Sequence, residues 1–213
     1  MTPTEQSQHA LALCQMAPVI PVLVIEDITH AVPLAEALVA GGLPVLEVTL
    51  RTEAALAAIK AMSAVPGAVL GAGTVLTPTQ MAEAKDAGAR FAVAPGATPA
   101  LIDAARVHEM PLLPGAQTCS EVMVLLEQGY TVQKFFPAEA IGGAGALKSI
   151  GGPLPQVTFC PTGGISMDRA PDYLRLSNVA CVGGSWVAPK DAMVNGDWQS
   201  IAALAQSASQ LPR

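Results

Sequence analysis

The feature that most constrains the fold is an alternation of short apolar runs with longer segments of helical period. The runs have strand length, are rich in β-branched residues and are bounded by glycine, proline or polar residues. The segments between them are rich in alanine and leucine, and several begin at a threonine and end at a glycine, as capped helices do. The eight predicted strands cover residues 19–25, 44–50, 68–75, 90–95, 111–115, 131–136, 157–164 and 179–186.

Strand followed by helix, repeated eight times, predicts an α/β fold with a parallel sheet. The number of repeats favours a (β/α)8 TIM barrel over an open doubly wound sheet, which would need fewer strands. Residues 4–15 precede the first strand, and we expect an extra N-terminal helix there that covers the barrel floor. The chain has no linker or low-complexity segment. A single domain over residues 1–213 is therefore expected.

Charge and composition exclude several kinds of partner. The net charge of −6 argues against a nucleic-acid partner, because phosphate binding calls for a basic face. No apolar run reaches the ~18 residues of a membrane span. Charged residues make up 13% of the chain, below the roughly 25% of an average soluble domain, which favours an oligomer. The first ten residues lack lysine and arginine, unlike a secretory signal, so we expect a cytoplasmic protein.

Neither histidines nor cysteines show the spacing of metal ligands. We therefore predict no metal and no cofactor, and interpret the cysteines as small apolar residues in a reducing compartment. The residues concerned are His9, His30, His108, Cys14, Cys119, Cys160 and Cys181.

Lys134 stands in the predicted strand "TVQKFF" (131–136), although lysine is among the residues least often buried. It lies near the end of the strand, where barrel enzymes place catalytic groups. Burial favours the neutral form of an amine, and a neutral amine attacks ketones, which indicates Schiff-base chemistry. The alternatives are an ammonium that reaches the rim or one that pairs with a carboxylate.

The second predicted strand carries polar residues at every other position. In "PVLEVTLRTE" (44–53), Glu47, Thr49 and Arg51 alternate with apolar residues suited to packing against helices, so the polar set is predicted to face the interior. Glu47 can transfer protons, and Arg51 near the mouth can hold a carboxylate bidentately. The alternative is a structural ion pair between Glu47 and Lys134.

Two glycine-rich segments, "CPTGGIS" (160–166) and "CVGGSW" (181–186), close the last two strands. Barrels often bind phosphate there through backbone N–H groups. The segments "GAGT" (71–74) and "APGAT" (94–98) similarly follow the third and fourth strands, where Thr74 and Pro95 can contact a small substrate. In all four places turn geometry is the alternative explanation.

The blocks "LEVTLRT", "GAGTV", "KFFPAE", "CPTGGI" and "GGSW", in this order, closely resemble the 2-keto-3-deoxy-6-phosphogluconate aldolase family. The similarity runs from about Pro18 to Asp197. It implies a class I aldolase on a (β/α)8 barrel that needs no metal, is usually homotrimeric and serves the Entner–Doudoroff pathway. Members of the family often also cleave 4-hydroxy-2-oxoglutarate.

Position by position, the resemblance implies that Lys134 forms the Schiff base and that Glu47, through a water, is the general acid and base. Arg51, Thr74 and Pro95 would line the carboxylate end of pyruvate. The implied phosphate ligands are Gly163, Gly164, Gly184 and Ser185. Two residues depart from the family pattern: Arg169 replaces an expected asparagine, and Cys119 replaces a frequent proline. Arg169 follows the phosphate loop and so puts phosphate affinity and substrate preference in doubt.

The expected reaction converts 2-keto-3-deoxy-6-phosphogluconate into pyruvate and glyceraldehyde 3-phosphate. Three other functions stay open on the sequence. One is a phosphosugar isomerase or epimerase in which Lys134 acts only electrostatically, the second a phosphosugar-binding protein without activity, and the third a metal-dependent aldolase. The galactonate-derived isomer is an alternative substrate.

Overall fold

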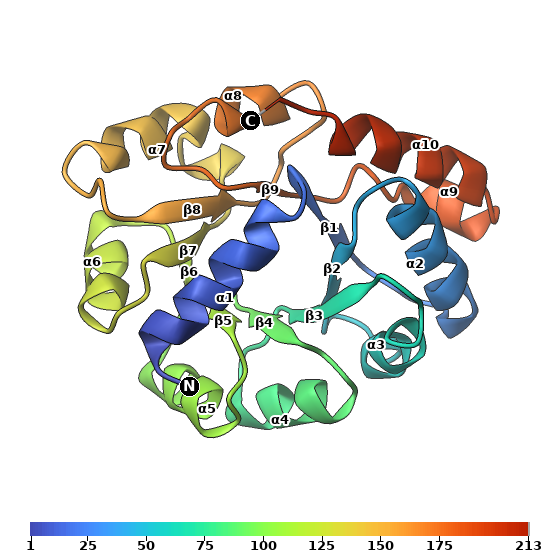
Figure 1. Cartoon of the computed structure of the whole chain (residues 1–213), viewed down its shortest axis with the longest axis horizontal. Helices are drawn as coiled ribbons and strands as arrows, with labels where there is room; N and C mark the ends of the chain where they lie inside the picture. The colour runs from blue at the N-terminus through green and yellow to red at the C-terminus, as the bar shows by residue number, and fades with distance from the viewer. Residues whose placement is uncertain (213) are drawn as a thin grey trace.

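The computed structural model describes residues 1–212 and shows parallel strands at the centre with helices around them (Figure 1). Each strand lies within one of the predicted runs, except that the last residue of β6 falls just outside, which confirms the α/β class with a parallel sheet. The strands are β1 (Val19–Leu23), β2 (Val45–Thr49), β3 (Val69–Gly73), β4 (Phe91–Val93), β5 (Leu112–Leu113), β6 (Gly115–Ala116), β7 (Val132–Phe135), β8 (Thr158–Pro161) and β9 (Val182–Gly184).

The helices begin where the sequence supplies caps. Thr2, Thr77, Thr98 and Thr118 each accept a hydrogen bond from a backbone N–H in the first turn of the helix that follows. The helices are α1 (Pro3–Gln15), α2 (Ala31–Ala40), α3 (Ala55–Met62), α4 (Pro78–Asp86), α5 (Pro99–Val107), α6 (Cys119–Glu127), α7 (Gly143–Gly151), α8 (Ala170–Leu174), α9 (Lys190–Val194) and α10 (Trp198–Ser209), with 3-10 turns η1 (Ile28–His30) and η2 (Glu139–Ile141). Within residues 1–212, no helix combines the length and apolarity needed to cross a bilayer.

The strands pair in the orders β5-β4-β3-β2-β1-β9 and β6-β7-β8, with every ladder parallel. Pro114 separates β5 from β6, since proline has no N–H for the ladder, and its carbonyl accepts the N–H of Lys134 at 2.8 Å. A bridge between Thr162 and Gly183 connects β8 with β9. The curled sheet is consistent with a TIM-like fold. Its strand order follows the chain, unlike that of a doubly wound sheet.

The buried apolar residues form two clusters on opposite sides of the strands. On β2, Leu46 and Val48 belong to the large cluster under the helices, whereas Val45 belongs to a smaller inner cluster. The α1 helix, which crosses the strands in Figure 1, contributes Ala10 and Cys14 to that inner cluster. Its other members are Ile20, Phe91, Val93, Leu113, Val132, Cys160 and Cys181.

Polar contacts dock α1 against the start of β7. The Tyr130 hydroxyl donates to Gln6 Oε1 at 2.8 Å, and the Thr131 N–H donates to Ser7 Oγ at 3.0 Å. Gln6 and Ser7 are buried. Because buried polar groups need hydrogen-bond partners, these contacts define where α1 lies.

Candidate active site

The interior of the sheet holds a buried ion pair. Lys134 Nζ lies 3.1 Å from Glu47 Oε1, and the two residues are only 5% and 3% exposed. On β7, Val132 belongs to the inner cluster and Phe135 to the outer one, so Lys134 points inward as the alternation predicts. Gln133 points the other way and donates to the carbonyls of Val122 and Tyr130. The predicted inward orientation of Glu47 is confirmed, and the structure places Lys134 on the same interior side.

Burial controls the protonation of Glu47. Removal from water raises the pKa of its carboxyl above the ordinary value, and the nearby Lys134 opposes the shift only in part. A proton can therefore be shared between carboxyl and amine. The predicted alternative, a purely structural ion pair, has the same geometry, but such buried pairs contribute little net stability.

Gly73 makes room for Glu47. A Cβ atom at this position of β3 would overlap the Glu47 carboxylate. The structure shows that its missing side chain is what lets the acid lie inside.

Phe136 is a further neighbour of the amine. Its ring centroid lies 5.5 Å from Lys134 Nζ, within the range in which an aromatic face attracts a cation. Alternation along the strand places Phe136 on the same face as Lys134, but the contact itself was not predicted.

Thr162 is a candidate that the sequence interpretation missed. It follows β8, is buried, and its Oγ1 has no hydrogen-bond partner among residues 1–212. The absent side chain of Gly183 leaves space for this hydroxyl, since a Cβ there would overlap it. A buried hydroxyl without a partner costs free energy, so Thr162 is available to a ligand or a water. The signal in the sequence was its position just before Gly163.

Three predicted residues lie just beyond the carboxyl ends of successive strands. Arg51 is exposed in the turn after β2 and makes no hydrogen bond or ion pair within residues 1–212. Thr74 follows β3 with a φ of 57°, a left-handed conformation that is strained for a β-branched residue. Pro95 follows β4 and is half-buried. None of the three is hydrogen-bonded to the Lys134–Glu47 pair.

The first of the two segments predicted to bind phosphate contains glycines with positive φ angles. Gly163 and Gly164 have φ values of 108° and 76°, which favour glycine. The loop after β7 is bound to this segment, because the Ala138 N–H donates to the Thr162 carbonyl at 2.8 Å and the Glu139 N–H to the Gly163 carbonyl at 3.1 Å. At Gly184, a Cβ would overlap the Trp186 ring.

Ser185 lines a cavity of about 630 Å³ together with Val22, His30 and Lys190. Val22 is the register partner of Glu47 on the neighbouring strand. The cavity thus reaches the predicted phosphate residue Ser185, but neither Glu47 nor Lys134 lines it.

The two departures from the family pattern have different surroundings. Arg169 forms ion pairs with Glu139 at 3.4 Å and Asp172 at 3.8 Å, and the Tyr173 hydroxyl donates to the same Glu139 carboxylate. Much of the charge of Arg169 is thus directed at carboxylates. Cys119 is the exposed first residue of α6, and nothing in the structure explains it.

A profile of the family described as KDPG and KHG aldolase matches residues 11–204. The chain belongs to this family. The 2-dehydro-3-deoxy-phosphogluconate aldolase of Pseudoalteromonas atlantica is 57% identical over 192 residues, which cover 90% of this chain and 89% of that protein.

Solved structures of KDPG aldolases share the fold. The enzyme of Zymomonas mobilis ZM4, solved with 3-phosphoglycerate, has a TM-score of 0.90 and 53% identity and covers 95% of both chains. The enzyme of Legionella pneumophila, with pyruvate captured as a covalent carbinolamine intermediate, has a TM-score of 0.91 and 50% identity. That match covers 94% of this chain and 98% of the other.

Proposed function

We propose that this chain is a class I aldolase that cleaves 2-keto-3-deoxy-6-phosphogluconate to pyruvate and glyceraldehyde 3-phosphate in the Entner–Doudoroff pathway, and that it also acts on 4-hydroxy-2-oxoglutarate. The buried Lys134–Glu47 contact of 3.1 Å is the observation that carries the proposal. The names of close relatives support the substrate, and the covalent pyruvate adduct of the Legionella enzyme supports the chemistry.

The reaction begins with neutral Lys134 attacking the C2 ketone. Loss of water leaves an iminium, which accepts electrons. Glu47, through a water, removes the proton of the C4 hydroxyl, the C3–C4 bond breaks, and its electron pair moves into the iminium to form an enamine. Glyceraldehyde 3-phosphate leaves. The proton held by Glu47 then returns to C3, and hydrolysis releases pyruvate and restores the amine.

The two ends of the substrate are held by different residues. Arg51 binds the carboxylate beside Thr74 and Pro95. The partnerless hydroxyl of Thr162 is a further donor to the substrate. The phosphate lies on the backbone N–H groups of Gly163, Gly164 and Gly184 and on the Ser185 hydroxyl. Ser185 lines a cavity of about 630 Å³, which supports its part in binding the phosphate.

The same proposal extends to the whole molecule. Residues 1–213 form one domain, a complete (β/α)8 barrel whose floor is covered by α1. The barrel works as a homotrimer, which the low charged fraction of 13% supports. It acts in the cytoplasm, since its cysteines are free thiols, as is usual in reducing compartments.

Borohydride reduction in the presence of pyruvate tests the function. We expect loss of activity and a mass increase, by reduced pyruvate, on the peptide that contains Lys134. Lys134→Ala should lose both the adduct and turnover, while Lys60→Ala, an exposed lysine of α3, should keep both. An isomerase or epimerase would give no adduct. A binding protein without activity would show no carbon–carbon cleavage in a coupled assay.

Two further measurements address the remaining alternatives. A metal-dependent aldolase would lose activity in EDTA, and we expect full activity there. Comparing kcat/KM for the gluconate-derived and galactonate-derived phosphates decides the preferred isomer, and we expect the gluconate-derived phosphate to be preferred. A higher value for the galactonate-derived isomer would contradict the substrate assignment but not the Schiff base.

A further inference from the structure

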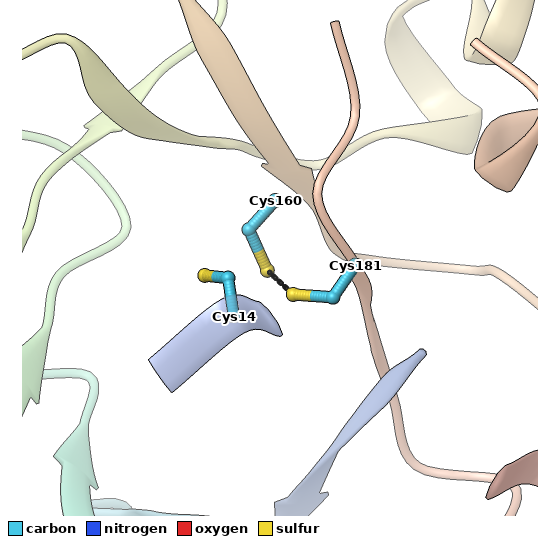
Figure 2. A group of neighbouring side chains, drawn as sticks. All are labelled: Cys14, Cys160 and Cys181. Atoms are coloured by element: carbon cyan, nitrogen blue, oxygen red, sulfur yellow. Dashed lines mark hydrogen bonds between the residues drawn. The ribbon is translucent and has the colours of Figure 1, made fainter. Parts of the chain in front are cut away.

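Three cysteines from distant parts of the chain lie close together in the inner cluster. Cys14 lies on α1, Cys160 on β8, and Cys181 directly before β9. Their Sγ atoms all lie within 4.8 Å of one another, and the Cys181 thiol donates to Cys160 Sγ at 3.5 Å. Figure 2 shows the three side chains beside one another on three separate elements, with the hydrogen bond between Cys160 and Cys181.

The distances between the three sulfur atoms suit a single metal ion bound to all three. A metal–sulfur distance of about 2.3 Å and a trigonal arrangement place sulfur atoms ~4.0 Å apart. The observed separations, from 3.5 Å to at most 4.8 Å, bracket this value. Small rotations of the side chains are therefore enough to bring all three sulfurs into bonding distance.

The surroundings select the kind of ion. The three residues are 1%, 2% and 0% exposed, and they belong to the apolar inner cluster with Ala10 and Ile20. Among residues 1–212, no fourth histidine, cysteine or carboxylate ligand joins the group. Zn²⁺ in structural sites almost always takes four ligands, whereas soft thiolate sites select Cu(I).

We propose that Cys14, Cys160 and Cys181 form a three-coordinate site for a single soft, thiophilic cation, of which Cu(I) is the representative. Binding replaces thiol protons, which pass to solvent, and changes no oxidation state. Since the three ligands come from different elements, the bound ion connects α1 directly to β8 and to the residue before β9. Cys160 is the register partner of Lys134, so the site lies beside the Lys134–Glu47 pair, but its thiols have no part in the proposed aldolase reaction.

Titration of the reduced, full-length protein with Cu(I) under anaerobic conditions tests the site. With a chromophoric Cu(I) chelator as competitor, we expect the protein to remove one equivalent. X-ray absorption should then show three sulfur ligands. Because the ion binds the folded state, the melting temperature should rise, and amide hydrogen exchange should slow in α1 (Pro3–Gln15).

Variants separate this site from other thiols. Cys14→Ser, Cys160→Ser and Cys181→Ser should each lose the single tight equivalent, while Cys119→Ser, which removes the exposed thiol of α6, should keep it. If the strand variants fail to fold, Cys14→Ser still decides the question. Wild-type affinity in Cys14→Ser, a two-sulfur spectrum, loss of binding in Cys119→Ser, or a preference for four-coordinate Zn²⁺ would each overturn the proposal.

Discussion

At the scale of single residues, Glu47 is the group whose chemistry depends most on its surroundings. It is an acid inside an apolar sheet, with an amine 3.1 Å away and a glycine opposite. Burial makes its ionised form costly, so its carboxylate forms only at a higher pH than in an exposed glutamate.

The raised pKa of Glu47 leads to a prediction about how activity depends on pH. Because Glu47 must be ionised to accept the C4 hydroxyl proton, kcat/KM should fall as the pH decreases through its pKa. That fall should occur above the ordinary glutamate value of 4.5. Glu47→Gln should remove this limb and slow turnover by roughly 10²–10⁴-fold, yet still be trapped by borohydride with pyruvate. The acidic fall of kcat/KM is measured in pH–rate profiles of the wild type, of Glu47→Gln and of the exposed control Glu83→Gln. An unchanged acidic fall in Glu47→Gln would refute the role of Glu47 as the general base.

A second prediction concerns Gly73. Alanine there overlaps the Glu47 carboxylate, so Gly73→Ala should displace the acid, lower kcat and destabilise the fold by about 1–3 kcal/mol. Gly145→Ala is the matched control, because no atom lies within 4 Å of its added Cβ. Within α7 this substitution should stabilise by about 0.5–1 kcal/mol. Denaturant unfolding and steady-state kinetics compare the two; equal stability and kcat would mean that Glu47 has room to move.

The residues differ in how well the sequence predicts them. The orientation of Glu47 and Lys134 follows from two-residue periodicity, which each strand carries in its own sequence. The partnerless hydroxyl of Thr162 and the grouping of Cys14 with Cys160 and Cys181 depend on which strands and helices become neighbours. No spacing within a short segment encodes such contacts, so they appear only in three dimensions.

At the scale of elements, strand positions were predictable, but the division of the fifth strand was not. The run at 111–115 has the composition of one strand. Whether Pro114 interrupts it depends on whether a neighbouring strand would pair with a backbone N–H at this position, which proline lacks. The position of α1 was expected on the barrel floor. Its contacts through Gln6 and Ser7 could not be predicted, because both residues are polar and have no signal of burial.

The docking of α1 gives a prediction for Ser7. Its hydroxyl accepts the N–H groups of Thr131 and Val132, so Ser7→Ala removes the partner of the buried Val132 N–H. We expect a loss of about 1–3 kcal/mol in the free energy of unfolding. Ser149→Ala, which removes an exposed hydroxyl from α7, should change it little. Urea unfolding of both variants provides the comparison, and equal midpoints would show that Ser7 does not hold α1 in place.

At the scale of the whole molecule, α5 and α6 carry three exposed large apolar side chains, Val107, Met123 and Val124, together named the α5–α6 patch. These side chains are 77%, 49% and 53% exposed. Patches of this kind mark contact surfaces between proteins. We propose that the α5–α6 patch forms part of the trimer contact.

Val124→Glu tests this placement. If the proposed homotrimer uses this patch, a charge there should convert it into monomers, because an unpaired carboxylate would be buried at the contact. Met16→Lys, which changes an exposed apolar residue outside the patch, should leave the trimer intact. Analytical ultracentrifugation gives the masses. A trimer in Val124→Glu, or monomers in Met16→Lys, would place the contact elsewhere.

The hydrogen bonds from Ala138 and Glu139 to the segment after β8 have a consequence for selectivity. They tie the backbone just beyond the reacting amine to the backbone proposed to receive the phosphate. The distance between the Lys134 amine and the proposed phosphate site is therefore fixed. Phosphorylated analogues one carbon shorter or longer should reach one end only, so that the enzyme selects among phosphorylated substrates by length.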